Sequence, residues 1–398
     1  MATATRTRTA RISAVRREGE RVTPLELFFD LVFVLAITQC TALMSAHPSW
    51  SGLAQGILVL GVLWWSWGGY AWLTSVVDPE EGAVRFAMFA AMAAFLIAAI
   101  AVPDAFSSLA LPFALAYGAV RAAHIALFVL ASRDDPGLRH SVAGLAVSTA
   151  IGVGLLIAAS FLNGLAQGLL WVLALALDMG GPLFVIDASG WRLEPGHFAE
   201  RHGLIIIIAL GESIVAIGVG AHVHLTAGIA AAAALGIALA AELWWMYFDV
   251  VALVSRRRLI NAPEGLERNK LARDSYSYIH FPMVAGIVLV ALGLKTTLGN
   301  VGDPLATIPA FALLGGVSAY LLGLVAFRFR HVHSINPQRL GMAVLVFALF
   351  PLATNAPALA TVAVITAVLA AIITYETRSY GEGRGRARRE DFAPERPH

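Results

Sequence analysis

Residues 203–221, GLIIIIALGESIVAIGVGA, form an unbroken apolar run that contains one ionisable side chain, Glu212. A helix rises about 1.5 Å per residue, so a run of this length crosses the hydrocarbon core of a bilayer. The run is continuous and does not alternate, which indicates a helix rather than a strand. The whole chain is 58% hydrophobic and 14% charged, with a mean hydropathy of +0.74. The sequence therefore predicts an all-α polytopic membrane protein.

About twelve segments of the chain are long and apolar enough to be transmembrane helices. Short connections join them, so consecutive helices are expected to be antiparallel neighbours. Their predicted limits are 25–45, 51–74, 84–103, 108–131, 139–161, 165–187, 203–221, 226–253, 273–294, 305–327, 338–354 and 357–376.

The basic residues are distributed unevenly about these segments. Of the 28 Lys and Arg, all except Lys295 and Arg121 fall in the two tails or in every second loop. Basic residues resist translocation, so this side is expected to be cytoplasmic, with both termini inside. The arginines of the tails fit contact with anionic lipid better than nucleic-acid binding. A single cysteine, Cys40, excludes an internal disulfide and a cysteine-based metal site.

The two halves of the sequence are similar. Trp64-Trp65 in the second span corresponds to Trp244-Trp245 in the eighth, and Asp30 in the first span corresponds to Glu212 in the seventh. Six spans in each half make the two repeats parallel, unless the similarity is a coincidence between apolar helices. The predicted organisation is a basic cytoplasmic tail (1–24), a first six-helix repeat (25–187), a cytoplasmic linker (188–202), a second six-helix repeat (203–376) and a disordered basic tail (377–398).

Two stretches carry a family resemblance. Residues 23–34 read TPLELFFDLVFV, and residues 197–213 read HFAERHGLIIIIALGES. Together with the two Trp pairs, they resemble the bacterial low temperature requirement protein A family over most of the chain, from about Val22 to Glu376. The resemblance implies a multipass protein of the bacterial cytoplasmic (inner) membrane. The family name records a growth phenotype in the cold, so the resemblance implies no substrate.

A fainter resemblance is to the endolysosomal potassium channels built from two six-helix repeats. Their first helix in each repeat carries a Phe-Ser-Asp motif followed by an Ala-Ile pair. Phe29-Asp30, and Glu212-Ser213 followed by Ala216-Ile217, look similar, although the Ser is missing before Asp30 and the second acid is Glu. This resemblance implies a cation channel with a pore lined by the first and seventh spans.

Ionisable side chains fall inside six of the predicted spans. Such groups are costly in a bilayer and mark either a transport pathway or a paired structural site. Counted along their helices, they occupy one layer from the middle of the membrane to its inner half. The structural alternative is an ion pair between an acid and the arginine, together with hydrogen-bonded core histidines. The residues are Asp30, Arg121, His124, Asp178, Glu212, Glu242 and His280.

A second polar cluster, which includes His197, Glu200 and Arg201, precedes the seventh span. An acid suits the positive end of a helix, and basic residues suit the inner membrane surface. The functional alternative is a gate that pairs with Asp30 or Glu26. The spacing does not match a metalloprotease helix. We expect no metal, no cofactor and no nucleotide site. The expected partners are membrane lipid and a small solute or ion, and a homo-oligomer is left open.

The leading functional hypothesis is translocation of a small solute or ion with proton coupling or gating. Asp30 and Glu212 would bind the cation or proton, Arg121 would tune them, and His124 and His280 would pass protons. The alternatives are a cation channel lined by spans one and seven, an intramembrane lipid-modifying enzyme, and a structural membrane protein. We do not expect an enzyme, because no nucleophile or metal constellation is visible.

Helix breaks would separate two of these hypotheses. Pro282, and Gly180-Gly181-Pro182, lie where spans nine and six would break in a carrier. Uninterrupted first and seventh spans lined by Ile and Leu would favour a hydrophobically gated channel.

Overall fold

The computed structural model describes residues 21–80, 82–184, 190–220, 226–381 and 385, and within them it is helical with no strand. Twelve stretches of helix in these residues are long and apolar enough to cross a membrane, as predicted. The helices are α1 (Pro24–Ala46), α2 (Trp50–Thr74), α3 (Gly82–Ala101), α4 (Ala110–Ala131), α5 (Pro136–Ala159), α6 (Gly164–Phe184), α7 (Pro195–Gly220), α8 (Ala227–Phe248), α9 (Val251–Ile260), α10 (Leu266–Ala272), α11 (His280–Gly299), α12 (Thr307–Val332), α13 (Pro337–Ala348), α14 (Phe350–Asn355) and α15 (Ala358–Ser379).

Local sequence sets the beginning of α1. Thr23 is the N-cap: its hydroxyl accepts a hydrogen bond from the Glu26 amide at 3.3 Å, and the Glu26 carboxylate accepts one from the Thr23 amide at 2.8 Å. Pro24 follows at the first helical position, where its missing N–H costs nothing. This capping box satisfies two amides that the helix leaves unpaired, and it holds Glu26 in a buried position.

The beginning of α7 differs from the prediction. The helix starts at Pro195, whereas the sequence placed its start at 203 and assigned 188–202 to a linker. The polar residues His197, Arg201 and His202 lower the hydropathy of this turn, yet all three are buried. Their contacts with other helices stabilise a helical turn that hydropathy alone assigns to the surface.

The sequence suggested helix breaks in spans six and nine, but no non-helical segment interrupts either span at these places. Helix α6 continues through Pro182 to Phe184. In span nine, α10 passes into a π-helical turn, Arg273–Ile279, and then into α11. Pro282 follows this turn closely, and in a regular α-helix its ring would press against the Tyr278 carbonyl. Inserted π turns are frequent at functional sites.

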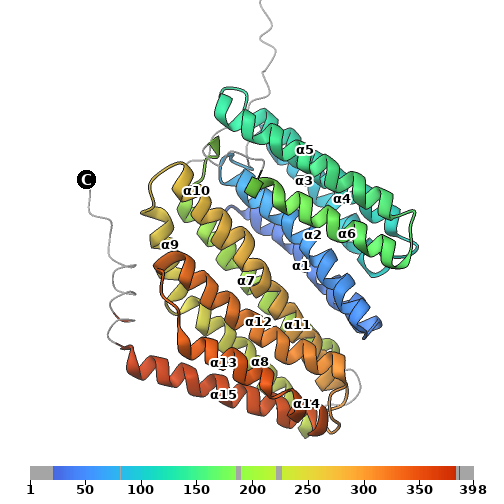
Figure 1. Ribbon diagram of the computed structural model, residues 1–398, viewed down its shortest axis with the longest axis vertical. Helices are drawn as coiled ribbons and strands as arrows, with labels where there is room; N and C mark the ends of the chain where they lie inside the picture. The colour runs from blue at the N-terminus through green and yellow to red at the C-terminus, as the bar shows by residue number, and fades with distance from the viewer. Residues whose placement is uncertain (1–20, 81, 185–189, 221–225, 382–384, 386–398) are drawn as a thin grey trace, which may run out of the picture.

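The helices of the two halves meet at the centre of the molecule. Figure 1 shows α1 and α2 beside α7 and α11, with α3–α6 on one side and α8, α13 and α15 on the other. Helix α1 packs on α2 and α3, and α7 packs on α8 and α11. Likewise, α3 packs on α4 and α11 packs on α12. Two six-helix repeats would give these matching contacts, and the repeat itself stays a prediction.

Candidate functional site

One buried ion cluster joins α1 to α7. Arg201 of α7 lies between two acids of α1: its Nη2 is 2.5 Å from Asp30 Oδ1, and its Nη1 is 3.4 Å from Glu26 Oε1. His197 Nε2 is 2.8 Å from Glu26 Oε1. All four side chains are fully buried. Arg201 and His197 thus contact both acids that the sequence offered as partners, whereas Glu200 is exposed. A gating role stays a prediction.

Helix α2 completes this cluster. Trp67 Nε1 donates to Asp30 Oδ1 at 2.8 Å, and the Trp67 ring lies 5.5 Å from the Arg201 guanidinium carbon. Thr74 Oγ1 accepts from Arg201 Nη1 at 3.0 Å. A buried charge needs such a set of partners, because its solvation by water is lost. Sequence reasoning missed Trp67, although it is part of the Trp-rich stretch 64–72.

Glu212 lies in a second contact between α1 and α7. The Thr38 hydroxyl donates to Glu212 Oε2 at 2.5 Å, and Glu212 is only 2% exposed. Among the residues that the structure describes, no Lys or Arg forms an ion pair with this carboxylate. Asp30 and Thr38 are separated by eight residues, or about 12 Å of helix. The structure therefore does not bring Asp30 and Glu212 into one site.

Arg121 belongs to a third polar group, within the first half. Its Nη2 is 2.9 Å from Asp178 Oδ1 and donates to Thr149 Oγ1 at 2.5 Å. Tyr117 donates to Asp178 Oδ2 at 3.1 Å. Among the acids of the predicted layer, Asp178 is therefore the ion-pair partner of Arg121.

The two histidines of the predicted layer have different surroundings. His280 Nδ1 donates to the Ser275 carbonyl at 3.0 Å, so its Nε2 accepts from the Tyr247 hydroxyl at 2.9 Å. His124 of α4 instead lies close to Gly69 of α2, where a methyl group on the glycine would meet the imidazole ring. Glu242 of α8 is partly exposed. These three residues are therefore not members of one site.

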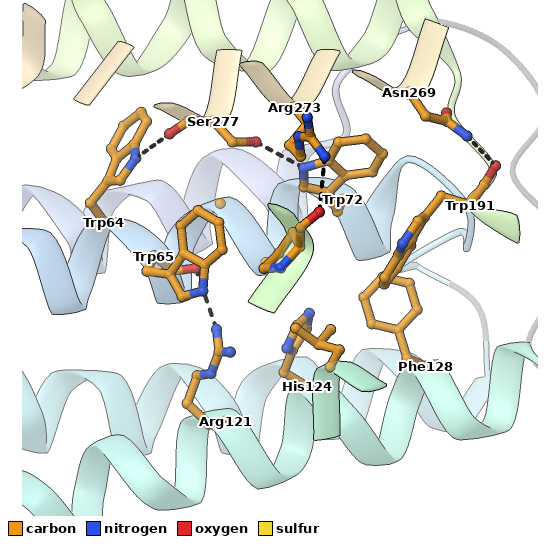
Figure 2. Close-up of a pocket in the computed structure, with 14 residues that line it drawn as sticks. Trp64, Trp65, Trp72, Arg121, His124, Phe128, Trp191, Asn269, Arg273 and Ser277 are labelled. Atoms are coloured by element: carbon orange, nitrogen blue, oxygen red, sulfur yellow. Dashed lines mark hydrogen bonds between the residues drawn. The ribbon is translucent and has the colours of Figure 1, made fainter. Parts of the chain in front are cut away.

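A cavity of about 60 Å³ lies between α2, α4 and the π turn. In Figure 2, Arg121 and His124 lie on one side, Arg273 and Ser277 lie on the other, and tryptophan rings lie between them. Trp64 and Trp65 line this cavity, whereas Trp244 and Trp245 of α8 are 43% and 38% exposed. The lining residues are Trp64, Trp65, Gly68, Gly69, Trp72, Arg121, His124, Phe128, Leu145, Pro182, Trp191, Asn269, Arg273 and Ser277.

The sequence could have indicated only part of this cavity. Trp72 shares one helical stripe with Trp64, Trp65 and Gly68, so its position was readable from the spacing. Trp191 and Arg273 lie far apart in the sequence and meet only through the fold. Among the described residues, no three His, Cys, Asp or Glu side chains are grouped so that they could hold a metal ion.

Comparison with known proteins identifies the family. Residues 21–374 match the model of the bacterial low temperature requirement A protein. The chain belongs to the bacterial low temperature requirement A family. An uncharacterized protein of Rhizobium meliloti (strain 1021) is 31% identical to this chain over 309 residues, which cover 75% of each chain. No solved structure matches the chain. Family membership and the twelve apolar helices together make this a multipass membrane protein.

Proposed function

We propose that this protein moves a small solute or ion across the bacterial inner membrane, and that proton binding at Glu212 drives or gates the movement. The observation that carries the proposal is the contact of a buried carboxylate with a hydroxyl group instead of a cation, between the central helices of the two halves. Ionisable groups inside a bilayer are costly, and they persist where they are paired or functional.

Other buried acids near the bundle centre have arginine partners. Asp30 and Glu26 share Arg201, and Asp178 contacts Arg121. A proton or cation that binds one of these acids must compete with a fixed guanidinium. Glu212 has no ion-pair partner among the described residues, and Lys295 of α11 attracts it only at longer range. The Thr38 hydroxyl can donate to the carboxylate or accept from the carboxylic acid. Glu212 is therefore the acid best suited to exchange a proton.

The position of Glu212 links proton exchange to a movement of the two halves relative to each other. It joins α7 to α1, while the Arg201 cluster joins the same two helices about 16 Å away along α7. In a carrier built from two repeats, the halves rock about a central site. We propose that the Arg201 cluster holds the two halves together during this movement and that the contact around Glu212 opens and closes.

The test is flux into liposomes that contain the purified protein or its Glu212→Gln variant, under imposed potassium, sodium and pH gradients. We expect flux through the wild type and none above empty liposomes through the variant. Glu267→Gln, at an exposed site in α10, is the matched control. Equal flux through Glu212→Gln and the wild type would contradict the proposal, provided that both proteins elute as folded monodisperse particles.

One observation favours a second candidate, a cation channel lined by α1 and α7. Both helices are uninterrupted, and buried Ile205, Ile206 and Leu210 lie on α7 between the two polar contacts. Constrictions of this kind gate channels by excluding water. The same flux assay separates the two candidates. A channel conducts its ion down any gradient, whereas a proton-coupled carrier moves its solute against a gradient when a pH difference is imposed.

A further inference from the structure

The walls of the cavity combine flat aromatic faces with basic side chains. Trp64, Trp65, Trp72 and Trp191 supply indole rings, and Arg121 and Arg273 supply guanidinium groups. Among the residues that line it, all of which the structure describes, there is no Asp or Glu. Aromatic faces alone would suit a cation. Both guanidinium groups are ion-paired, Arg121 with Asp178 and Arg273 with Asp274, and neither acid lines the cavity. The polar groups that line the cavity are therefore mainly donors and not carboxylates, which favours an anion over a cation.

The partners of Arg121 leave a place for such an anion. Arg121 uses Nη2 for Asp178, and its Nη1 makes only a long contact of 3.4 Å with the Trp65 carbonyl. Its Nε is buried and has no hydrogen-bond partner in the part of the chain that the structure describes. A buried donor without a partner is costly, and an acceptor in the cavity would satisfy it. Arg273 is held opposite by Asp274 and the Pro182 carbonyl.

The volume limits the size of the anion. A water molecule needs about 10–15 Å³ of such space, so a cavity of about 60 Å³ accepts about four or five non-hydrogen atoms. Gly68 adds to this space, because a Cβ atom at this position would meet nothing within 4 Å. A short aliphatic carboxylate fits these limits, with its oxygens toward the arginines and its apolar part against the tryptophans.

We propose that this cavity is a binding site for a small carboxylate, such as acetate or propionate. A second hollow of about 210 Å³ lies beside it and shares Trp191 and Asn269 with it. Asn269 Nδ2 donates to the Trp191 carbonyl at 2.8 Å, so the two shared residues are hydrogen-bonded to each other. The second hollow is lined by Arg192 and Arg268 and also by Glu194 and Glu264, so its wall carries charges of both signs. The proposal concerns binding and does not depend on Glu212 or on transport.

The experiment measures binding to the full-length protein in detergent, by tryptophan emission and by the midpoint of thermal unfolding. Propionate is titrated beside propionamide and propylammonium, which have a similar shape but carry no charge and a positive charge respectively. We expect saturable binding of propionate and binding of propionamide weaker by about tenfold or more, because a charge-assisted hydrogen bond is lost. Propylammonium should not bind. Propionamide or propylammonium binding as tightly as propionate would overturn the proposal.

Two variants locate the site. Gly68→Leu fills the cavity without meeting another atom at its Cβ, and it should abolish propionate binding. Gly154→Leu in α5 is the matched control, because its Cβ also meets nothing within 4 Å but the residue is exposed and outside the cavity. Arg273→Gln should weaken the binding of propionate by about tenfold. The fold of this variant should survive, because Asp274 keeps Arg330 as a partner.

The outcomes separate this proposal from the proposed function. Glu212→Gln should bind propionate as the wild type does, so failure of the flux test leaves the site intact. Propionate binding that survives in folded Gly68→Leu would place the anion elsewhere and overturn the assignment. Absence of propionate binding to a wild-type protein that shows Glu212-dependent flux would likewise overturn the carboxylate site and leave the proposed function standing.

Discussion

The two places where α1 and α7 exchange polar contacts hold their acids differently. Near the start of both helices, Glu26 and Asp30 share one arginine, Arg201. Further along, Glu212 accepts a hydrogen bond from the Thr38 hydroxyl of α1 at 2.5 Å and forms no ion pair with any described residue. The first arrangement resists change, because removal of one partner leaves a buried charge alone. The second can gain or lose a proton without breaking an ion pair. This difference suggests that α1 and α7 are fixed at one contact and adjustable at the other.

The largest effect should come from removing the shared cation. Arg201→Met leaves Glu26 and Asp30 buried without a guanidinium, and we expect a loss of about 3–5 kcal/mol in the free energy of unfolding. The measurement is the thermal midpoint and the folded fraction after size exclusion. Arg192→Gln is the control, because Arg192 is 65% exposed in its pair with Asp135. A change as small as that of Arg192→Gln would mean that the cluster does not stabilise the fold.

Neutralising one acid of the cluster should have a smaller effect. In Asp30→Asn, the amide oxygen still accepts from Trp67 and Arg201, and Arg201 keeps Glu26. We expect a loss of about 1.5–3 kcal/mol, the usual value for hydrogen bonds to a charged group. Combining Asp30→Asn with Arg201→Met should cost less than the sum of the single changes, since the residues are in contact. Additive effects in this double-mutant cycle would contradict direct coupling.

The Trp67 ring tests how far α2 supports this cluster. Trp67→Phe removes the donor to Asp30 Oδ1 and weakens the cation–π contact with Arg201. The expected loss is about 1–2 kcal/mol in the free energy of unfolding, from one hydrogen bond and one ring contact. Trp244→Phe is the control, because that side chain is 43% exposed and should change stability by less than about 0.5 kcal/mol. If the two variants lose the same free energy of unfolding, the loss comes from the smaller side chain and not from the hydrogen bond or the cation–π contact.

Hydropathy and local signals were sufficient to predict most of the fold. The twelve spans follow from the length and composition of the apolar runs. The predicted start of the first span at 25 lies one residue from the beginning of α1 at Pro24, which the Thr23–Glu26 capping box sets. The start of α7 could not be found in this way, because His197 and Arg201 are polar and are buried through contacts with other helices, α1 among them. A hydropathy profile records transfer to lipid and contains no information about partners distant in sequence.

The candidate site was harder to predict for the same reason. Depth along each helix placed Asp30, Arg121, Asp178 and Glu212 in one layer, but depth does not state which helices are neighbours. The pairs Asp30–Arg201 and Arg121–Asp178 and the contact Thr38–Glu212 depend on lateral packing. Small residues such as Gly69 decide this packing, because a side chain at Gly69 would collide with the His124 ring. A hydropathy profile does not identify such positions.

The smallest effect on stability should come from Glu212, and this result would sharpen the comparison most. In Glu212→Gln, the amide oxygen can still accept from Thr38, and no ion pair between described residues is broken. We expect a change of less than about 1 kcal/mol in the free energy of unfolding. Asp30→Asn, measured beside it, should be clearly more destabilising. If the two variants lose equal stability, Glu212 is held as firmly as Asp30, and the adjustable contact between the halves must lie elsewhere. If Glu212→Gln is stable and also lacks flux, the lost function cannot be attributed to unfolding. The carboxylate is then needed for its chemistry and not for its packing.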